Sequence, residues 1–290
     1  MPKKALITGA TGFVGSHLAR RLVKDGWTVT AIIRSSSNRD LIRVIENSIE
    51  CYEYDGTMES MQTILAESHP EIVFHLASFF LSRHQPQDIA TLIQSNITFG
   101  THLVEAAVTN DCFQFINTGT SWQHFGNEDY NPVNLYAATK QAFGDILKYY
   151  VEAHRLKVVT LKLFDTYGPD DPRPKLMNLL MRAAATGETL DMSPGEQLID
   201  LVHVDDVVNA YCAALEVINE MECGLIKEYG VTSGCPISLK EIVLKLEEEL
   251  GMKINVHWGA RPYQCREVMI PWNLAGSVPG WSVRVKTIKI

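Results

Sequence analysis

The 290-residue sequence predicts an α/β protein built on a doubly wound parallel sheet, followed by a smaller C-terminal α+β region. Two observations predict this fold. A short apolar run at residues 5–7 leads into three glycines at three-residue spacing, and apolar residues at helical intervals follow them. Apolar runs and helical patterns then alternate about every 25 to 35 residues, which is typical of parallel strands joined by helices.

The glycine turn between the first strand and the first helix predicts a dinucleotide-binding site. Gly9 permits a tight turn, Gly12 lets backbone N–H groups approach a pyrophosphate, and Gly15 lets the helix pack closely on the strand. The partial positive charge at the helix N-terminus favours an anion at the same place. We therefore expect a Rossmann-type domain at the start of the chain.

The remaining elements of this domain follow in order. Gly26 is expected to end the first helix, and a helix is expected to begin near Met58. Longer helices are predicted at residues 94–110 and 136–153. Further strands are predicted at residues 27–33, 50–54, 72–76, 113–117 and 157–164.

The chain changes character after Phe164, so we divide it into a dinucleotide-binding domain, 1–165, and a second region, 166–290. Within the second region, residues 198–220 are expected to return to the core of the first. The elements predicted there are a proline-rich loop at 167–174, helices at 176–186, 207–218 and 238–250, a strand before Pro194, a strand at 198–202, and a short strand or loose tail at 282–290.

Composition excludes several classes of protein. A net charge of -8 argues against nucleic-acid binding, and no apolar run is long enough to span a membrane. The N-terminus does not resemble a signal peptide. The six cysteines are scattered without a Cys-x-x-Cys motif, which favours free thiols in the cytoplasm. The histidines are equally dispersed, so we predict no metal site.

The loops after the second and third strands bear on the choice of cofactor. Arg34, Ser35 and Ser36 stand where an NAD-binding domain carries an acidic residue for the ribose hydroxyls. A cation and hydroxyl donors suit a 2′-phosphate better, which favours NADP over NAD; the alternative is a solvated loop. Asp55, followed by Gly56, can accept a hydrogen bond from adenine or cap the following helix.

Tyr136 and Lys140 are four residues apart and therefore share one face of a helix. Tyrosine, with a pKa of ~10, is a poor base at neutral pH, but a nearby ammonium lowers that pKa. The pair is suited to acid–base chemistry at a hydroxyl or a ketone. The alternative interpretation is an exposed pair on an ordinary helix.

Five motifs occur in one order along the chain. They are Thr8-Gly9-Ala10-Thr11-Gly12-Phe13-Val14-Gly15, the hydroxyl cluster at Thr120, Tyr136-x-x-x-Lys140, Tyr167-Gly168-Pro169 and Leu201-Val202-His203-Val204-Asp205-Asp206. In these motifs the chain resembles the extended short-chain dehydrogenase/reductase family, in its nucleotide-sugar epimerase, dehydratase and reductase branch. Within that branch it is similar to the reductases that make CDP-dideoxyhexoses. The resemblance implies that 166–290 is a substrate-binding region, which binds the nucleotide sugar.

The resemblance implies a role for each matched residue. Tyr136 would be the general acid/base, Lys140 would also hold the nicotinamide ribose, and a Ser/Thr hydroxyl would orient the substrate oxygen. Counting from the strand selects Thr120 for that hydroxyl, and counting back from Phe125-Gly126 selects Ser121. The implied cofactor-binding set is Gly9, Thr11, Gly12, Phe13, Val14, Gly15, Arg34, Ser35, Ser36, Asp55, Gly56, Leu76, Ala77, Ser78, Asn96, Tyr136, Lys140 and Phe164. The implied substrate-binding set is Thr120, Ser121, Arg261 and Arg266, the two arginines on the diphosphate.

Departures from the family's sequence pattern reduce the number of reactions that we expect. Its 4,6-dehydratases carry Asp-Glu after the catalytic threonine, whereas Ser121 and Trp122 follow Thr120 here, so dehydration is not expected. The family's usual final helix is also missing from the pattern after Trp281. Three functions remain: an NADP(H)-dependent reductase of a 4-keto-deoxyhexose on a nucleotide, an NAD-dependent nucleotide-sugar 4-epimerase, or a dinucleotide-sensing regulatory protein. Apolar residues on more than one side of the 94–110 and 136–153 helices indicate a second buried face. The resemblance implies that these helices pair with those of a second copy in a four-helix bundle, so we expect a homodimer.

Overall fold

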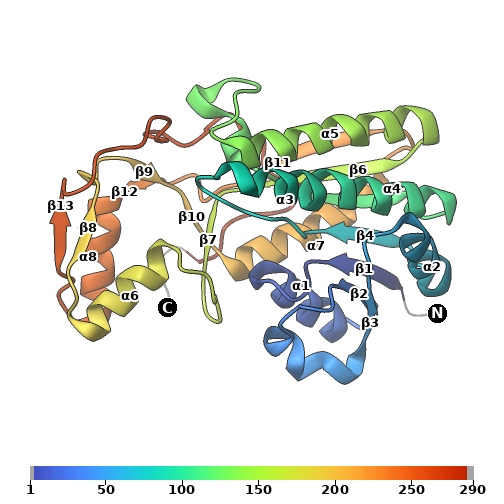
Figure 1. The fold of residues 1–290 in the computed structure, drawn as a ribbon, viewed down its shortest axis with the longest axis horizontal. Helices are drawn as coiled ribbons and strands as arrows, with labels where there is room; N and C mark the ends of the chain where they lie inside the picture. The colour runs from blue at the N-terminus through green and yellow to red at the C-terminus, as the bar shows by residue number, and fades with distance from the viewer. Residues whose placement is uncertain (1–2, 286–290) are drawn as a thin grey trace.

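The computed structural model describes residues 3–285 and centres on a seven-stranded sheet (Figure 1). Its order is β11-β6-β5-β4-β1-β2-β3, and all neighbouring strands are parallel. The order reverses between β1 and β4, where a doubly wound sheet opens a crevice at the carboxyl ends of its strands. The strands are β1 (Lys4–Thr8), β2 (Thr28–Ile33), β3 (Ile49–Glu53), β4 (Ile72–His75), β5 (Gln114–Thr120), β6 (Lys157–Leu163) and β11 (Ile226–Val231).

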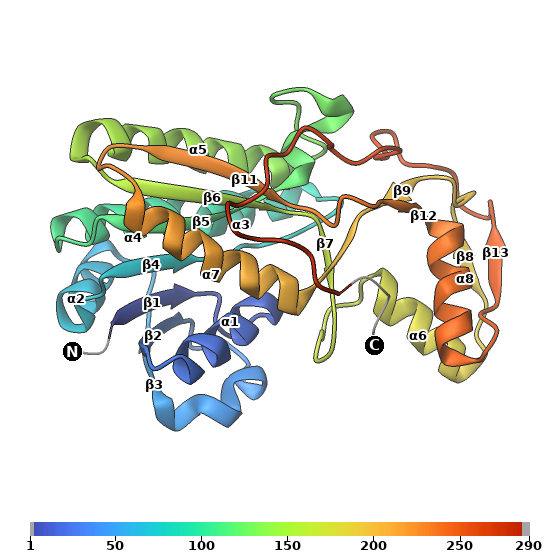
Figure 2. The same cartoon turned by 180° about the vertical axis from the view of Figure 1, so that it is seen from behind.

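Helices cover both faces of the sheet, which confirms the predicted fold class. One face packs against α1 (Phe13–Lys24) and α7 (Val204–Glu220) around a core that includes Leu18 and Tyr211 (Figure 2). The other face packs against α2 (Met58–Ser68), α4 (Phe99–Thr109) and α5 (Leu135–His154). Both cores form because each helix turns its apolar stripe towards the strands.

A second lobe has its own core around Leu180, Ile242 and Leu246. It is built from α6 (Leu176–Thr186), α8 (Leu239–Leu250), and the strand pairs β8 (Leu190–Met192) with β13 (Val256–Trp258) and β9 (Leu198–Ile199) with β12 (Ile237–Ser238). The pair β7 (Asp165–Tyr167) and β10 (Leu201–His203) lies between this lobe and the sheet.

Three predicted elements differ from the structure. The helix expected at 94–110 begins earlier, with α3 (Ile89–Ile93) and a π-helical turn (Gln94–Thr98) preceding α4. The strand expected at 198–202 is broken at Asp200, whose carboxylate accepts hydrogen bonds from Thr232 and Ser233. The return to the sheet reaches beyond residue 220, because β11 adds a seventh strand beside β6 that was not predicted.

The C-terminal segment crosses back over the sheet domain to α7. The indole of Trp281 donates to the Asp206 carbonyl at 2.8 Å, and the Asp206 carboxylate accepts from the backbone N–H groups of Arg284 and Val285. Residues 282–285 have no regular secondary structure, so no strand forms there; the rest of the predicted tail, 286–290, lies outside the described residues. No described helix has the length and apolar character needed to cross a bilayer.

Candidate active site

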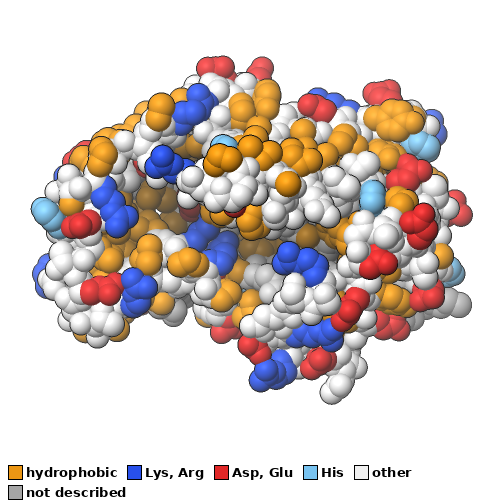
Figure 3. Space-filling view, viewed as in Figure 1, with side chains coloured by type: hydrophobic (Ala, Val, Ile, Leu, Met, Phe, Trp, Pro, Cys, Tyr) orange, Lys and Arg blue, Asp and Glu red, His pale blue; other side chains and the backbone are white. Residues whose placement is uncertain are grey.

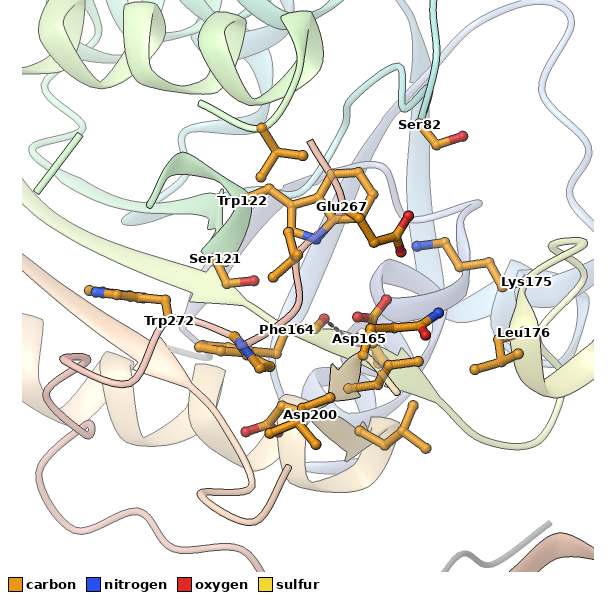
Figure 4. Close-up of a pocket in the computed structure, with 18 of the residues that line it drawn as sticks. Ser82, Ser121, Trp122, Phe164, Asp165, Lys175, Leu176, Asp200, Glu267 and Trp272 are labelled. Carbon is orange, nitrogen blue, oxygen red and sulfur yellow. Dashed lines mark hydrogen bonds between the residues drawn. The ribbon is translucent and has the colours of Figure 1, made fainter. Parts of the chain in front are cut away.

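Two adjoining cavities open between the sheet domain and the second lobe, where the surface is visibly hollowed (Figure 3). The inner cleft, about 240 Å³, lies at the carboxyl ends of β1, β4 and β5. The outer pocket, about 230 Å³, extends into the second lobe (Figure 4). The residues shared by both cavities are Ser121, Trp122, Phe164, Asp165, Thr166 and Lys175.

The glycine turn forms one wall of the inner cleft. A Cβ on Gly15 would lie 2.0 Å from the Gly9 carbonyl oxygen, and Gly9 itself has a φ of +74°. The N-cap of α1, Gly12, supplies no side-chain cap, so the first N–H groups of the helix are left without a side-chain acceptor beside the cavity. This wall fits the pyrophosphate of a dinucleotide cofactor.

Asn96 organises the neighbouring wall without facing the cleft. Its side chain is 1% exposed, accepts from the Phe79 N–H at 2.8 Å and donates to the Phe79 carbonyl and to Thr139 Oγ1, each at 3.0 Å. These bonds fix the loop after β4 against α5. The Asn96 amide uses both of its donors and one acceptor site within the protein, and a contact with the cofactor stays a prediction.

Tyr136 and Lys140 lie on the first two turns of α5, which is capped by the Asn134 side chain. Tyr136 lines the inner cleft, and Lys140 lies behind it, 3% exposed. Burial raises the pKa of Tyr136 to about 12, against the opposing effects of a hydrogen bond with Ser78 and the charge of Arg173. Burial lowers the pKa of Lys140 to about 8. At neutral pH the protein alone therefore holds a protonated phenol next to a largely protonated amine.

The two candidate hydroxyls follow each other at the end of β5. Thr120 lines only the inner cleft, and its Oγ1 accepts from the Trp122 N–H at 3.3 Å. Ser121 lines both cavities. The hydroxyl of Thr118, two residues earlier, forms hydrogen bonds within the protein instead. It donates to the His75 carbonyl and is bonded to the Tyr211 hydroxyl, each at 2.7 Å.

Only one of the two predicted arginines reaches the outer pocket. The Arg266 guanidinium lies 4.2 Å from the Phe125 ring centroid and donates to Asn131, while its buried Nε has no partner. Arg261 is exposed and lines neither cavity. Trp272, which belongs to none of the predicted motifs, stacks on His124 in the same pocket, with 3.9 Å between the ring centroids.

The residues predicted around the adenosine end lie outside the inner cleft. Arg34, Ser35 and Ser36 are exposed on the turn that follows β2. Asp55 accepts from the N–H and hydroxyl of Thr57, which lowers its pKa, and Thr57 rather than Asp55 caps α2. The other predicted cofactor residues that do not line the cleft are Thr11, Gly56, Ala77, Asn96 and Lys140, whereas Gly9, Gly12, Phe13, Val14, Gly15, Leu76, Ser78, Tyr136 and Phe164 line it.

Within the described range of 3–285, no three His, Cys, Asp or Glu side chains are grouped so that they could hold a metal ion. The sheet order, the glycine turn and the Tyr136–Lys140 pair together define a dinucleotide-dependent short-chain dehydrogenase/reductase. Residues 5–226 match the model of the NAD dependent epimerase/dehydratase family. The chain belongs to this family, which is the extended branch of the short-chain dehydrogenases/reductases, and is therefore an enzyme of the nucleotide-sugar epimerase and reductase type.

Individual relatives cover most of the chain. The CDP-abequose synthase of Salmonella typhimurium is 28% identical over 91% of this chain and 87% of its own length. A UDP-glucose 4-epimerase of Mycolicibacterium smegmatis is 30% identical over 73% of this chain and 72% of its own length. Among solved structures, MoeE5 in complex with UDP-glucuronic acid and NAD has a TM-score of 0.79 and 26% identity, covering 97% of this chain and 94% of its own.

Proposed function

We propose that the protein reduces a 4-keto-deoxyhexose carried on a nucleoside diphosphate, with NADPH as the reductant. The observation that carries this proposal is the inner cleft, where Tyr136 and Thr120 lie beside the glycine turn. Thr120 is followed by Ser121 and Trp122, so no acidic pair is available for dehydration. The similarity to CDP-abequose synthases supports a sugar of the deoxyhexose class.

The residues of the cleft fit the chemistry of ketone reduction. When bound, the nicotinamide supplies a hydride to the carbonyl carbon. The Tyr136 phenol gives its proton to the carbonyl oxygen, and the product is an alcohol. The Lys140 ammonium stabilises the phenolate left behind, and the Thr120 hydroxyl donates a hydrogen bond that orients the ketone. Tyr136 is then reprotonated from solvent.

The test is the oxidation of NADPH by purified protein on addition of CDP-4-keto-6-deoxyglucose or its UDP counterpart. Stoichiometric loss of NADPH with formation of a 4-hydroxy sugar is the expected result. A 4-epimerase, supported by the similarity to UDP-glucose 4-epimerases, would instead interconvert UDP-glucose and UDP-galactose with no net use of cofactor. Epimerisation without NADPH consumption would replace our proposal with that second one.

The choice of NADP over NAD rests on Arg34, because its guanidinium is exposed and unpaired among the described residues. A 2′-phosphate gripped by this group should make NADPH bind at least ~10-fold more tightly than NADH, which is about 1.4 kcal/mol. Fluorescence titration of both cofactors measures this ratio, and Arg34→Ala should bring it close to unity. Equal affinities in the parent protein would contradict the preference.

The protein is further proposed to be a cytoplasmic homodimer. Ile89, Ile93 and Tyr149 expose 43%, 39% and 60% of their surfaces on α3 and α5, which lie side by side on one face (Figure 1). Two such helix pairs would bury these side chains as a four-helix bundle. Six free cysteines support a reducing compartment.

A further inference from the structure

Two side chains of opposite charge lie where the inner cleft meets the outer pocket. Asp165 begins β7, Lys175 is the N-cap of α6, and both side chains line both cavities (Figure 4). No role was predicted for either residue.

Arg173 and the carboxylates of Asp171 and Asp200 have partners within the protein, whereas Glu267 of the outer pocket accepts only from the Gln264 N–H, at 3.1 Å. Arg173 donates to both carboxylate oxygens of Asp171 at 2.7 Å. Asp200 accepts from the Ser233 N–H at 2.7 Å and from Thr232. In contrast, neither Asp165 nor Lys175 forms an ion pair with any residue of the described chain. The Lys175 amine is thus a donor, and the Asp165 carboxylate an acceptor, that can still bind a ligand.

Asp165 and Lys175 are both half-buried, so leaving their charges without a partner is costly. Burial, helped by Asp200, raises the pKa of Asp165, while Lys175 and Arg173 oppose the rise. Burial lowers the pKa of Lys175, against the effects of Asp165 and Asp171. Buried charges of this kind are stabilised when a polar group bridges them. A group that accepts from the amine and donates to the carboxylate would do so.

Ring contacts place this pair near the reacting centre. The Lys175 Nζ lies 4.3 Å from the centroid of the Phe80 ring, and that ring lies 5.0 Å from the ring of Tyr136 in an edge-to-face contact. The Arg266 guanidinium, which suits a diphosphate, belongs to the outer pocket alone. The group that bridges Asp165 and Lys175 is therefore expected on the sugar rather than on the nucleotide.

We propose that Asp165 and Lys175 are specificity-determining residues that read one hydroxyl of the hexose, Lys175 donating to its oxygen and Asp165 accepting its hydrogen. A hydroxyl is the sugar substituent that is donor and acceptor at once. This proposal rests on the proposed function, because it assumes that a nucleotide sugar occupies the two cavities. It implies that a sugar lacking this hydroxyl binds more weakly.

Calorimetry with the NADP⁺-saturated protein tests the assignment. The probes are CDP-glucose and UDP-glucose, each compared with CDP or UDP alone. The dissociation constant of the free nucleotide divided by that of the sugar nucleotide gives a ratio that measures the contribution of the sugar. Asp165→Asn and Lys175→Met should each reduce this ratio by ~10-fold or more, because a hydrogen bond to a charged group is lost. The affinity for CDP or UDP should stay within ~2-fold of the parent value.

A pH series separates this role from a structural one. In the parent protein the ratio should fall as the pH drops through the raised pKa of Asp165, and in Asp165→Asn it should not change with pH. Glu188→Gln, which removes an exposed carboxylate of the second lobe that lines neither cavity, is the control and should leave the ratio unchanged. Lys175→Met still decides the question if Asp165→Asn does not fold.

Two results would overturn the assignment. Unchanged ratios in both variants would show that the pair does not read the sugar. If the variants bound the sugar nucleotides and the free nucleotides more weakly by the same factor, the pair would contact the diphosphate instead of the sugar. If the parent protein binds none of the four probes, the outcome is different, because it would refute the proposed function itself.

Discussion

Lys140 is the residue whose environment makes the clearest prediction about pH. It is 3% exposed, and burial lowers its pKa from 10.5 to about 8. Between these values the unfolded chain binds more protons here than the folded chain, so the free energy of unfolding rises with pH. Relative to Lys140→Met, the parent protein should gain about 1–2 kcal/mol between about pH 7 and about pH 9.5.

Urea unfolding of the cofactor-free parent and variant at both pH values measures this gain. Lys148→Met, at an exposed position of the same helix, is the control, and its difference from the parent should stay constant. A constant difference for Lys140→Met as well would mean that the amine is not desolvated by the fold.

Single residues were predictable where backbone chemistry or helical spacing constrains them. The glycines and the Tyr136–Lys140 pair belong to this group, because a turn and a helix fix their positions locally. The local hydrogen bonds of Asn96 and Asp55 were harder to predict, because a short polar side chain can bond to its own neighbourhood as easily as to a ligand. Asp165 and Lys175 gave no signal, because only the meeting of two lobes makes them neighbours.

At the scale of elements, the contact between β1 and α1 depends on Gly15. In Gly15→Ala the new Cβ would meet the Gly9 carbonyl oxygen at 2.0 Å, and backbone atoms cannot move aside without opening the turn. We expect a loss of about 1–3 kcal/mol in the free energy of unfolding and at least ~10-fold weaker cofactor binding. Chemical unfolding and fluorescence titration measure the two effects.

Gly144→Ala is the matched control, because Gly144 lies within α5 and a Cβ there meets no atom within 4 Å. This change should be neutral or stabilising by up to about 1 kcal/mol. If Gly15→Ala were as well tolerated as Gly144→Ala, our claim that the glycine turn packs closely against α1 would be wrong.

Elements with a continuous apolar run were predicted, and those defined by distant partners were not. The five later strands of the first domain and α6 and α8 follow their apolar patterns closely. β11 was missed because its sequence, Ile-Lys-Glu-Tyr-Gly-Val, is largely polar at its start and becomes a strand only by pairing with β6 at the edge of the sheet. The break at Asp200 is likewise caused by residues 232 and 233, far along the chain.

At the scale of the whole molecule, association should depend on the exposed apolar side chains of α3 and α5. The double variant Ile93→Glu and Tyr149→Glu places like charges on a surface that we propose to be buried between two copies. Light scattering should give twice the chain mass for the parent protein and the single chain mass for the variant. A parent protein that stays monomeric at all concentrations would contradict the dimer.

The central claim is that Tyr136 supplies the proton in a reduction that occurs between the sheet domain and the second lobe. Its most direct test is the turnover of Tyr136→Phe with NADPH and the 4-keto nucleotide sugar that the parent protein reduces. This variant keeps the ring and its contact with Phe80, so cofactor affinity should stay within ~3-fold, while turnover falls by ~10²–10⁴-fold. Thr120→Val should also lower turnover, and Ser121→Ala should have little effect. Turnover of Tyr136→Phe at the parent rate would contradict the account.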